Sequence, residues 1–337
     1  MRRTGLLALT ALAALHIAAL FAGSIGPYGP ARQIRDAPFA PPTRVRFIDT
    51  DGILHFRPFV YRLRETSGGL YEEDRNARFP LRFFVEGDEY KIVGGWSSKL
   101  HLFGVDAPGG VFLMGTDDLG RDQFSRFLHG ARISMFIGPA AAFLAIAIGF
   151  AMGATAGFYG KRVDEFLMAI TELFLSLPWL YLLLALRALL PLDVSAGEAF
   201  AAIAGLLGVI GWARPARMIR GVVMQAKQRE FVLAARGFGA TDLYLLRRHV
   251  APQARGVVLA QAALLIPQYI LAEVTMSFLG VGVSEPAASW GLMLAPLQQY
   301  HALVSHSWMW LPALLLVPIF GAYYALAAAL GGFSAAK

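Results

Sequence analysis

The sequence predicts an all-α polytopic membrane protein of about six transmembrane helices, with a small β-rich insert on the outer side. Hydrophobic residues make up 56% of the 337-residue chain and charged residues only 16%, whereas a soluble domain carries about 25% charged residues. Several apolar runs are long enough to cross a bilayer. The excess positive charge lies beside these runs, which indicates membrane orientation rather than binding to nucleic acid.

The N-terminal segment predicts a first transmembrane helix. A basic start, Met1–Arg3, precedes an apolar run from about residue 5 to residue 22. This pattern is typical of either a signal anchor or a cleaved signal peptide, and small residues near its end would permit cleavage. We expect residues 1–22 to remain as a signal anchor, which places the next segment on the outer side.

Residues 23–114 are expected to form an extracytoplasmic insert. From residue 23 to residue 130 the chain carries 14 basic and 14 acidic residues, so this region is neutral. Its start is rich in proline and is expected to be extended. Four short β-like runs follow, and the turn-like residues 86–89 are expected to join the last two into a hairpin. The runs are residues 44–48, 54–63, 81–85 and 90–93.

A charged segment, residues 115–132, follows the insert. It has no apolar run long enough to span a membrane. Phe124, Phe127 and Leu128 form a broken apolar stripe on a charged helix, which is typical of an element at the membrane interface.

The remainder, residues 133–337, is expected to be a core with five further transmembrane helices. Gly149, Gly153 and Gly157 are spaced four apart in the first of them, and such a face of small residues lets another helix approach closely. Trp290 suits the headgroup level of the membrane, as do the tryptophans at 308 and 310. The expected spans are residues 133–158, 166–190, 199–218, 256–280 and 308–330.

Two acids fall inside these expected spans. Acidic residues within a membrane are costly and indicate function by default. Glu172 either faces a translocation path or is solvated near the inner surface, and Arg187 is too far along the helix to pair with it. Glu273 is the second acid, and Ser277 lies one helical turn beyond it. These three residues are candidates for a translocation path.

A basic loop, residues 219–255, separates two apolar runs. Residues 214–255 carry nine Lys and Arg against Glu230 and Asp242, which predicts a cytoplasmic location. The loop breaks at Gly239, after which Thr241 is placed to cap a second helical piece. We predict a helix–glycine–helix element that lies flat at the membrane face and offers one side to a partner.

Catalytic and metal-binding patterns are absent from the sequence. There is no cysteine, so thiolate chemistry and disulfides are excluded. There is also no phosphate-binding P-loop, no zinc-protease helix motif and no serine nucleophile elbow. We therefore expect no catalytic residue, no metal and no cofactor, and any ATP hydrolysis must come from a separate subunit.

The basic loop resembles the "EAA" coupling loop of ABC-importer permeases, which docks on the ATPase subunit. Leu233 stands where the family has its leading Glu, and Glu230 is a candidate replacement. An ordinary basic cytoplasmic loop is the alternative. The residues assigned to coupling are Glu230, Ala234, Ala235, Gly239, Asp242 and Pro252.

Two more stretches resemble the dipeptide, oligopeptide and nickel permeases of ABC importers. One is the run from Glu273 to Gly291, which contains SFLG and Trp290-Gly. The other is the segment that leads into the core, GTDDLGRDQFSR. Its matching residues are Gly115, Thr116, Asp117, Gly120, Arg121, Asp122, Ser125 and Arg126.

This resemblance implies an ABC-importer permease core in the bacterial inner membrane, with both termini in the cytoplasm and peptides as the expected solute. It implies a second homologous permease subunit, two ATP-binding cassette ATPase subunits that bind the ATP, and an extracytoplasmic solute-binding protein. The alternative is a self-sufficient secondary transporter or an intramembrane enzyme that uses Glu172 and Glu273.

Overall fold

The computed structural model describes residues 3–66, 70–92, 95–189, 191 and 194–334. Four positions at which the sequence analysis begins or ends a segment, residues 1, 93, 190 and 337, lie outside the described residues. The chain divides into two compact units. A helical unit holds residues 1–12, 135–273 and 319–337, and a mixed unit holds residues 13–134 and 274–318.

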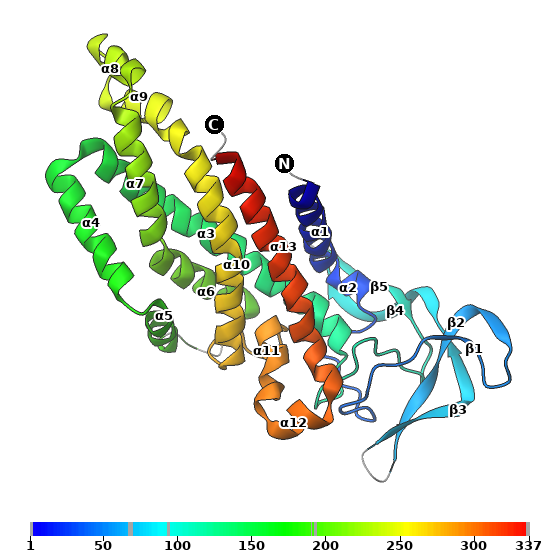
Figure 1. Ribbon diagram of the computed structural model, residues 1–337. Helices are drawn as coiled ribbons and strands as arrows, with labels where there is room; N and C mark the ends of the chain where they lie inside the picture. Colours follow the sequence, from blue (N-terminus) through cyan, green and yellow to red (C-terminus); the bar gives the residue numbers. More distant parts are fainter. Residues whose placement is uncertain (1–2, 67–69, 93–94, 190, 192–193, 335–337) are drawn as a thin grey trace. The chain divides into compact units, whose positions relative to one another are not determined.

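The chain is mostly helical, as predicted (Figure 1). Among the residues that the structure describes, four helical stretches are long and apolar enough to cross a membrane, and the number rises to as many as six if each of two bent helix pairs counts as one span. The four are α1 (Arg3–Leu20), α3 (Gln123–Tyr159), the stretch Asp242–Phe278 that ends in α10 (Arg255–Phe278), and Ser307–Leu330, which includes most of α13 (Leu311–Ser334).

The two bent pairs stand where single spans were expected. Helices α4 (Lys161–Ser176) and α5 (Trp179–Ala188) meet at 85°. Pro178 lies at this break, and it lacks the amide that would continue α4. Helices α6 (Ala196–Gly211) and α7 (Ala213–Lys227) meet at 45°. Helix α7 therefore continues well into the segment that was expected to be loop from residue 219.

Within the helical unit, α3 and α7 pack through the row of glycines in α3. A Cβ atom on Gly149 would lie 2.8 Å from Cβ of Pro215, and one on Gly157 would lie 2.7 Å from the Arg220 carbonyl oxygen. A Cβ on Gly153 would overlap the backbone of Ala216. The prediction of a small-residue face that another helix approaches closely is confirmed, and α7 is that helix.

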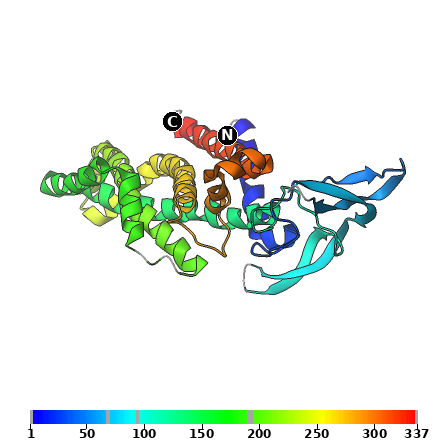
Figure 2. The same ribbon diagram turned by 90° about the horizontal axis from the view of Figure 1, so that it is seen from below.

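In the described part of the mixed unit, five antiparallel strands form two sheets, which Figure 2 shows from below. The first sheet has the order β1-β2-β3, and β4 pairs with β5 in the second. The strands are β1 (Arg46–Ile48), β2 (Leu54–Glu65), β3 (Tyr71–Pro80), β4 (Arg82–Lys91) and β5 (Ser97–Gly104).

The predicted hairpin through residues 86–89 is wrong. Strand β4 runs straight through these residues, and its partner is β5. The register shifts between Glu86 and Tyr90, so the turn-like residues form an irregularity within a strand instead of a turn. Strands β3 and β5 were not expected, because β3 is rich in charged residues and neither strand alternates clearly.

The segment expected at the membrane interface, residues 115–132, divides into a buried loop and the first turns of α3. Gly115 and Gly120 adopt positive φ angles of 75° and 71°, a conformation that glycine adopts without strain. Thr116 is fully buried. Its hydroxyl donates to the Ala37 carbonyl at 2.6 Å and accepts from the Ala40 amide at 2.7 Å.

A network of charges lies beside this loop in the mixed unit. Arg121 Nε donates to Asp117 Oδ2 at 2.7 Å. Glu285 joins Arg121 and Arg126, because its two carboxylate oxygens lie 2.9 Å from Nη1 and Nη2 of these residues, respectively. Burial alone would lower the pKa of Arg121, but Asp117 and Glu285 raise it above its ordinary value. The network therefore surrounds two nearly buried guanidinium groups with acidic partners.

Asp122 caps the start of α3. Its Oδ2 atom accepts from the Ser125 amide at 2.8 Å, as an N-cap side chain does. The side chain is buried, and Oδ1 has no hydrogen-bond partner among the described residues. Burial raises the pKa of the Asp122 carboxyl from 3.8 to about 7, even though its hydrogen bonds with Ser125 lower it.

Trp290 is packed inside the protein. It begins the short helix α11 (Trp290–Leu294) and is fully buried in the mixed unit. Its Nε1 donates to the Phe127 carbonyl at 3.1 Å, and its ring stacks on that of Phe127 with 5.5 Å between the ring centroids. The ring therefore contacts protein, and its position at the headgroup level stays a prediction. A second short helix, α12 (Tyr300–Ser305), follows.

Substitution Gly153→Ala tests the packing of α3 on α7. The added methyl group would displace the backbone at Ala216, so we expect a loss of roughly 1–3 kcal/mol in the free energy of unfolding, measured in detergent. Gly205→Ala in α6 is the matched control, because nothing lies within 4 Å of its Cβ position. There a better helix former should stabilise by roughly 0.5–1 kcal/mol. Equal effects at both sites would contradict the close packing.

Substitution Asp122→Asn tests the raised pKa of this carboxyl. Between about pH 4 and pH 7 the unfolded chain is ionised at Asp122 while the folded chain stays protonated. The wild type should therefore lose stability as the pH rises through this range, by up to roughly 4 kcal/mol, and lose no more above it.

The Asn variant should lack this component because Asn does not ionise, while its side-chain oxygen still caps Ser125. Asp118→Asn, at an exposed neighbour, is the control and should keep the wild-type pH profile. Unfolding measured from pH 4 to pH 8 compares the three proteins, and identical profiles for wild type and Asp122→Asn would contradict the assignment.

Candidate functional site

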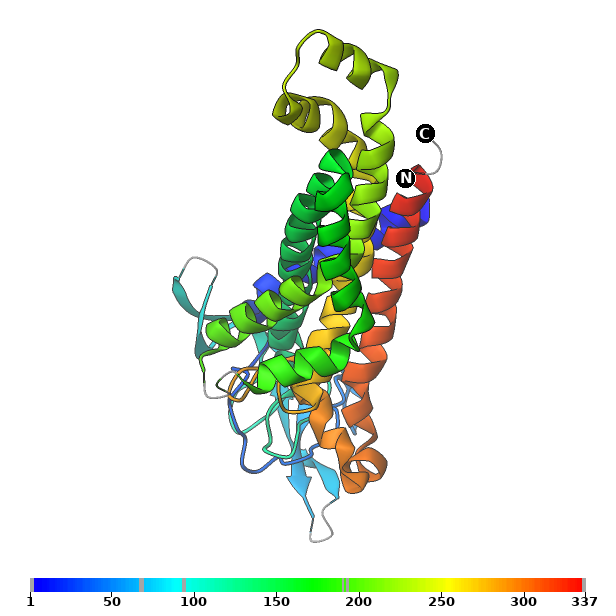
Figure 3. The same cartoon turned by 90° about the vertical axis from the view of Figure 1, so that its left-hand side faces the viewer.

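The basic loop forms two short helices that connect α7 to α10. Helix α8 is Glu230–Gly237 and helix α9 is Asp242–Leu245. A π-helical turn (Leu246–Val250) and a 3-10 turn (Ala251–Ala254) lead from α9 into α10. Figure 3 shows α8 and α9 beyond the ends of α7 and α10, at the top of the view.

The break between α8 and α9 occurs at the glycine that the sequence predicts, and the predicted threonine caps the second helix. Gly239 has a φ of 85°, and its amide donates to the Arg236 carbonyl at 3.0 Å as α8 ends. The Thr241 hydroxyl accepts from the Tyr244 amide at 3.4 Å and caps α9. Arg236 and Asp242 form an ion pair of 3.1 Å across the break. The predicted sequence of helix, glycine break and second helix is confirmed, while its orientation at the membrane face stays a prediction.

One side of this element is anchored on the helical unit. Val232, Leu245 and Val250 are buried. Their packing partners come from both long helices beside them: Ala154 and Phe158 in α3, and Ile219, Val223 and Ala226 in α7. Burying three such side chains contributes about 1.5–3 kcal/mol each. The element is therefore held against α3 and α7 by its inner side.

The other side is exposed and both apolar and basic. We call its five large apolar side chains the loop patch: Phe231, Leu233, Phe238, Leu243 and Tyr244, of which Phe238 is 93% exposed. Arg229, Arg247 and Arg248 lie on the same segment, and none of them has an ion pair among the described residues. A groove of about 390 Å³ is lined by Thr241, Leu243, Tyr244, Arg247 and Arg248.

The residues assigned to coupling fall on different sides of the element. Glu230 is exposed in the first turn of α8, and Leu233 lies three residues later and 53% exposed. Ala234 and Gly239 are exposed, whereas Ala235 is half-buried against the cluster beneath. Pro252 is half-buried in the 3-10 turn. The surface offered to a partner is thus made mainly by large side chains that the motif does not include.

The three residues suggested for a translocation path differ in their surroundings. Glu172 is 71% exposed at its side chain, and its Oε1 accepts from Arg217 Nη2 at 3.2 Å. Glu273 is fully buried. Ser277 is also buried, and its Oγ accepts from the Val283 amide at 3.1 Å. Among the described residues no group of three or more His, Asp or Glu side chains is placed to hold a metal ion.

Sequence reasoning missed three residues at these sites. They are Glu285, which neutralises the two arginines of the charge network; Arg217, the partner of Glu172; and Phe238, the most exposed side chain of the loop patch. Two arginines in a segment that becomes buried need a nearby acid, but the sequence does not say which acid supplies it.

Comparison with known proteins places the chain among transport permeases. Residues 145–335 match the model of the family described as the binding-protein-dependent transport system inner membrane component. The chain is 41% identical over 179 residues to the dipeptide transport system permease protein DppC of Bacillus subtilis, which covers 53% of this chain and 54% of that protein.

Two further relatives are oligopeptide transport system permease proteins named OppC. The one from Bacillus subtilis is 42% identical and covers 53% of this chain and 57% of that protein. The one from Escherichia coli is 36% identical, and the match covers 54% of this chain and 58% of that protein. The chain spans somewhat more than half the length of these relatives. A solved structure of the MetNI methionine ABC transporter aligns with a TM-score of 0.45 and 18% identity, covering 60% of this chain and 95% of that chain.

The family model covers more than half of the 337 residues and includes α8 and α9. The chain belongs to the family of inner membrane components of binding-protein-dependent transport systems.

Proposed function

We propose that this chain is a permease subunit of an ATP-driven importer in the bacterial inner membrane, and that α8 and α9 couple it to a separate ATPase subunit. The observation that carries the proposal is the loop patch, an exposed apolar and basic surface on a firmly anchored element at the ends of α7 and α10. An exposed cluster of large apolar side chains marks an interaction surface.

The anchoring explains how such contact would act on the membrane helices. Val232 and Leu245 join α8 and α9 to the cluster that contains Phe158 of α3 and Val223 of α7. A partner that pulls on the loop patch would therefore move α3 and α7 with it instead of deforming a loose loop. Alternating access then requires that the ATPase contacts this surface differently in its two states.

The partner's surface should be apolar and acidic. The loop patch supplies five large apolar side chains, and beside it lie three arginines that form no ion pair with any residue the structure describes. Asp242 is already paired with Arg236, so the uncompensated charge of the segment is positive. Complementary charge would steer the two subunits together and fix their orientation.

The remaining assignments rest on the charge pattern and on the names of the relatives. The basic residues beside α7 and α10 favour a cytoplasmic location for the loop patch and for both termini. Peptides are the proposed solute because the relatives are dipeptide and oligopeptide permeases. The proposed assembly adds a second homologous permease, two ATPase subunits that bind the ATP, and an extracytoplasmic solute-binding protein.

Cysteine crosslinking tests the ATPase contact, since the natural chain has no cysteine. Leu243→Cys places a thiol in the loop patch, and Gln225→Cys places one on an exposed position of α7 outside it. In native membranes the Leu243→Cys protein should crosslink to a P-loop ATPase with a yield that ATP changes, while the Gln225→Cys protein should not. Equal labelling of both thiols by a soluble reagent without capture would contradict docking.

Substitution Gly239→Val tests whether the break between α8 and α9 matters for transport. A β-branched residue is strongly disfavoured at a φ of 85°, so the patch should lose its shape and ATP-dependent peptide uptake by cells should fall at least tenfold. Gly237→Val is the matched control, because Gly237 is helical and nothing lies within 4 Å of its Cβ position.

Both variants should reach the membrane at wild-type levels, because neither position is packed. Normal uptake by the Gly239→Val protein would argue against coupling through this element. Uptake that follows a proton gradient and continues without ATP would instead favour the secondary transporter that uses Glu172 and Glu273.

A further inference from the structure

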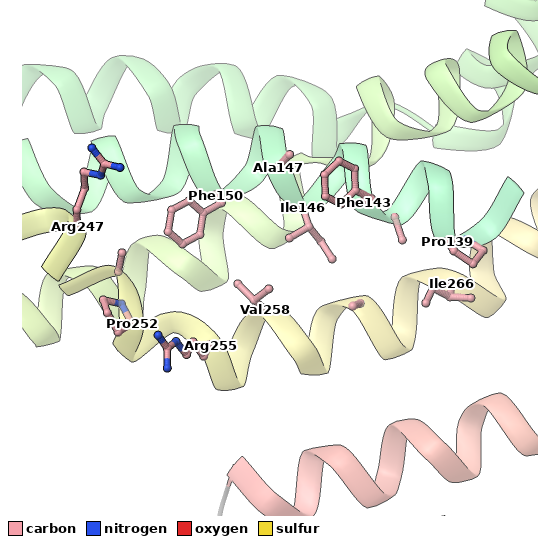
Figure 4. Close-up of a pocket in the computed structure, with 13 residues that line it drawn as sticks. Pro139, Phe143, Ile146, Ala147, Phe150, Arg247, Pro252, Arg255, Val258 and Ile266 are labelled. Carbon is pink, nitrogen blue, oxygen red and sulfur yellow. The ribbon is translucent and has the colours of Figure 1, made fainter. Parts of the chain in front are cut away.

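A second groove lies in the helical unit between α3 and α10, and its volume is about 780 Å³. Figure 4 shows side chains from both helices around it and two arginines near one end. The lining is apolar along most of its length and is not filled by side chains of the unit. Among the residues that line it are Pro139, Phe143, Ile146 and Phe150 of α3, and Val258 and Ile266 of α10.

The length of the groove matches one leaflet of a membrane. It extends from Pro139 to Phe150 along α3 and from Arg255 to Ile266 along α10. At a rise of 1.5 Å per residue each stretch is about 16 Å long. The hydrocarbon core of a bilayer is about 30 Å thick, so the groove covers about half of it. That is the depth reached by the acyl chains of a single lipid layer.

The two arginines stand where the headgroup of such a lipid would be. Arg255 is the first residue of α10, and Arg247 lies in the turn that precedes it. Both line the groove, no acidic residue does, and neither arginine has an ion pair among the described residues. A guanidinium group binds phosphate oxygens through two parallel hydrogen bonds. The groove thus joins a long apolar channel to a site suited to phosphate.

We propose that this groove binds an anionic membrane phospholipid, with an acyl chain between α3 and α10 and the phosphate held by Arg247 and Arg255. The two arginines at one end favour a phospholipid over an uncharged apolar occupant, because its phosphate would meet them there. A lipid without net charge would offset neither of the two positive charges, whereas an anionic phospholipid offsets at least one of them.

This assignment does not depend on the solute or on the ATPase contact. Arg247 also lines the smaller groove beside Tyr244, so the bound headgroup would hold a side chain at the edge of the loop patch. The lipid would then stabilise the π-helical turn that follows α9, which is where the element joins the helical unit.

Native mass spectrometry of the full chain in mild detergent tests the proposal. Phosphatidylglycerol and phosphatidylcholine with identical oleoyl chains are added in turn. The wild type should bind one phosphatidylglycerol in preference to phosphatidylcholine. The double variant Arg247→Gln/Arg255→Gln should bind phosphatidylglycerol about thirtyfold more weakly, as expected for the loss of two cationic groups.

The double variant Arg229→Gln/Arg248→Gln is the matched control, because it removes the same charge from the same segment at positions that do not line this groove. It should bind phosphatidylglycerol as the wild type does. Equal weakening in both double variants would show diffuse attraction to the basic surface and overturn the site, as would equal binding of the two lipids by the wild type.

Substitution Ala262→Phe tests the apolar half of the site without changing its charge, because Ala262 lines the groove. It should weaken binding of both lipids while the unfolding temperature in detergent stays within a few degrees of the wild type. If the variant instead binds phosphatidylglycerol normally but no longer copurifies with a second permease subunit, the groove is a protein interface and the lipid proposal is wrong.

Discussion

The absence of side chains at three glycines of α3 is the constraint on which the helical unit depends. Any Cβ atom at Gly149, Gly153 or Gly157 would meet atoms of α7, so α7 can lie against α3 only because these positions are glycine. In lipid there is no hydrophobic force between helices, and close backbone packing replaces it. Because α7 carries the chain into α8, the same contact determines where the basic element begins.

The element then gains its position from the buried cluster at this end of α3 and α7. Phe158 and Val223 provide the floor, and Val232, Leu245 and Val250 pack onto it from successive parts of the loop. The inner side chains make the contacts that hold the element in place, so the large apolar side chains on the outer side are not needed for its packing. Phe238 shows this division clearly, since a residue that is 93% exposed contributes little to the core and belongs to the loop patch where the ATPase contact is proposed.

Sequence reasoning succeeded where the determining contacts are local. The positive φ of Gly239 and the cap by Thr241 depend on residues within one or two turns, and the glycine row of α3 is a simple helical period. It failed where a distant segment decides the outcome. Strand β4 pairs with β5 instead of turning at residues 86–89. One span was expected at residues 166–190, where α4 and α5 instead meet at 85°.

Arginine is used in two physically different ways in this chain, and the difference separates structure from function. In the mixed unit, Arg121 and Arg126 are nearly buried and share Glu285 and Asp117. A buried cation without such partners would cost several kcal/mol, so these two charges are neutralised inside the fold.

Four other arginines are exposed and have no ion pair among the described residues: Arg229, Arg247, Arg248 and Arg255. Their charge remains available, and two grooves with apolar walls lie beside it. Leu233 adds to this balance, because a carboxylate at its position would neutralise part of the basic surface that the partner is proposed to meet.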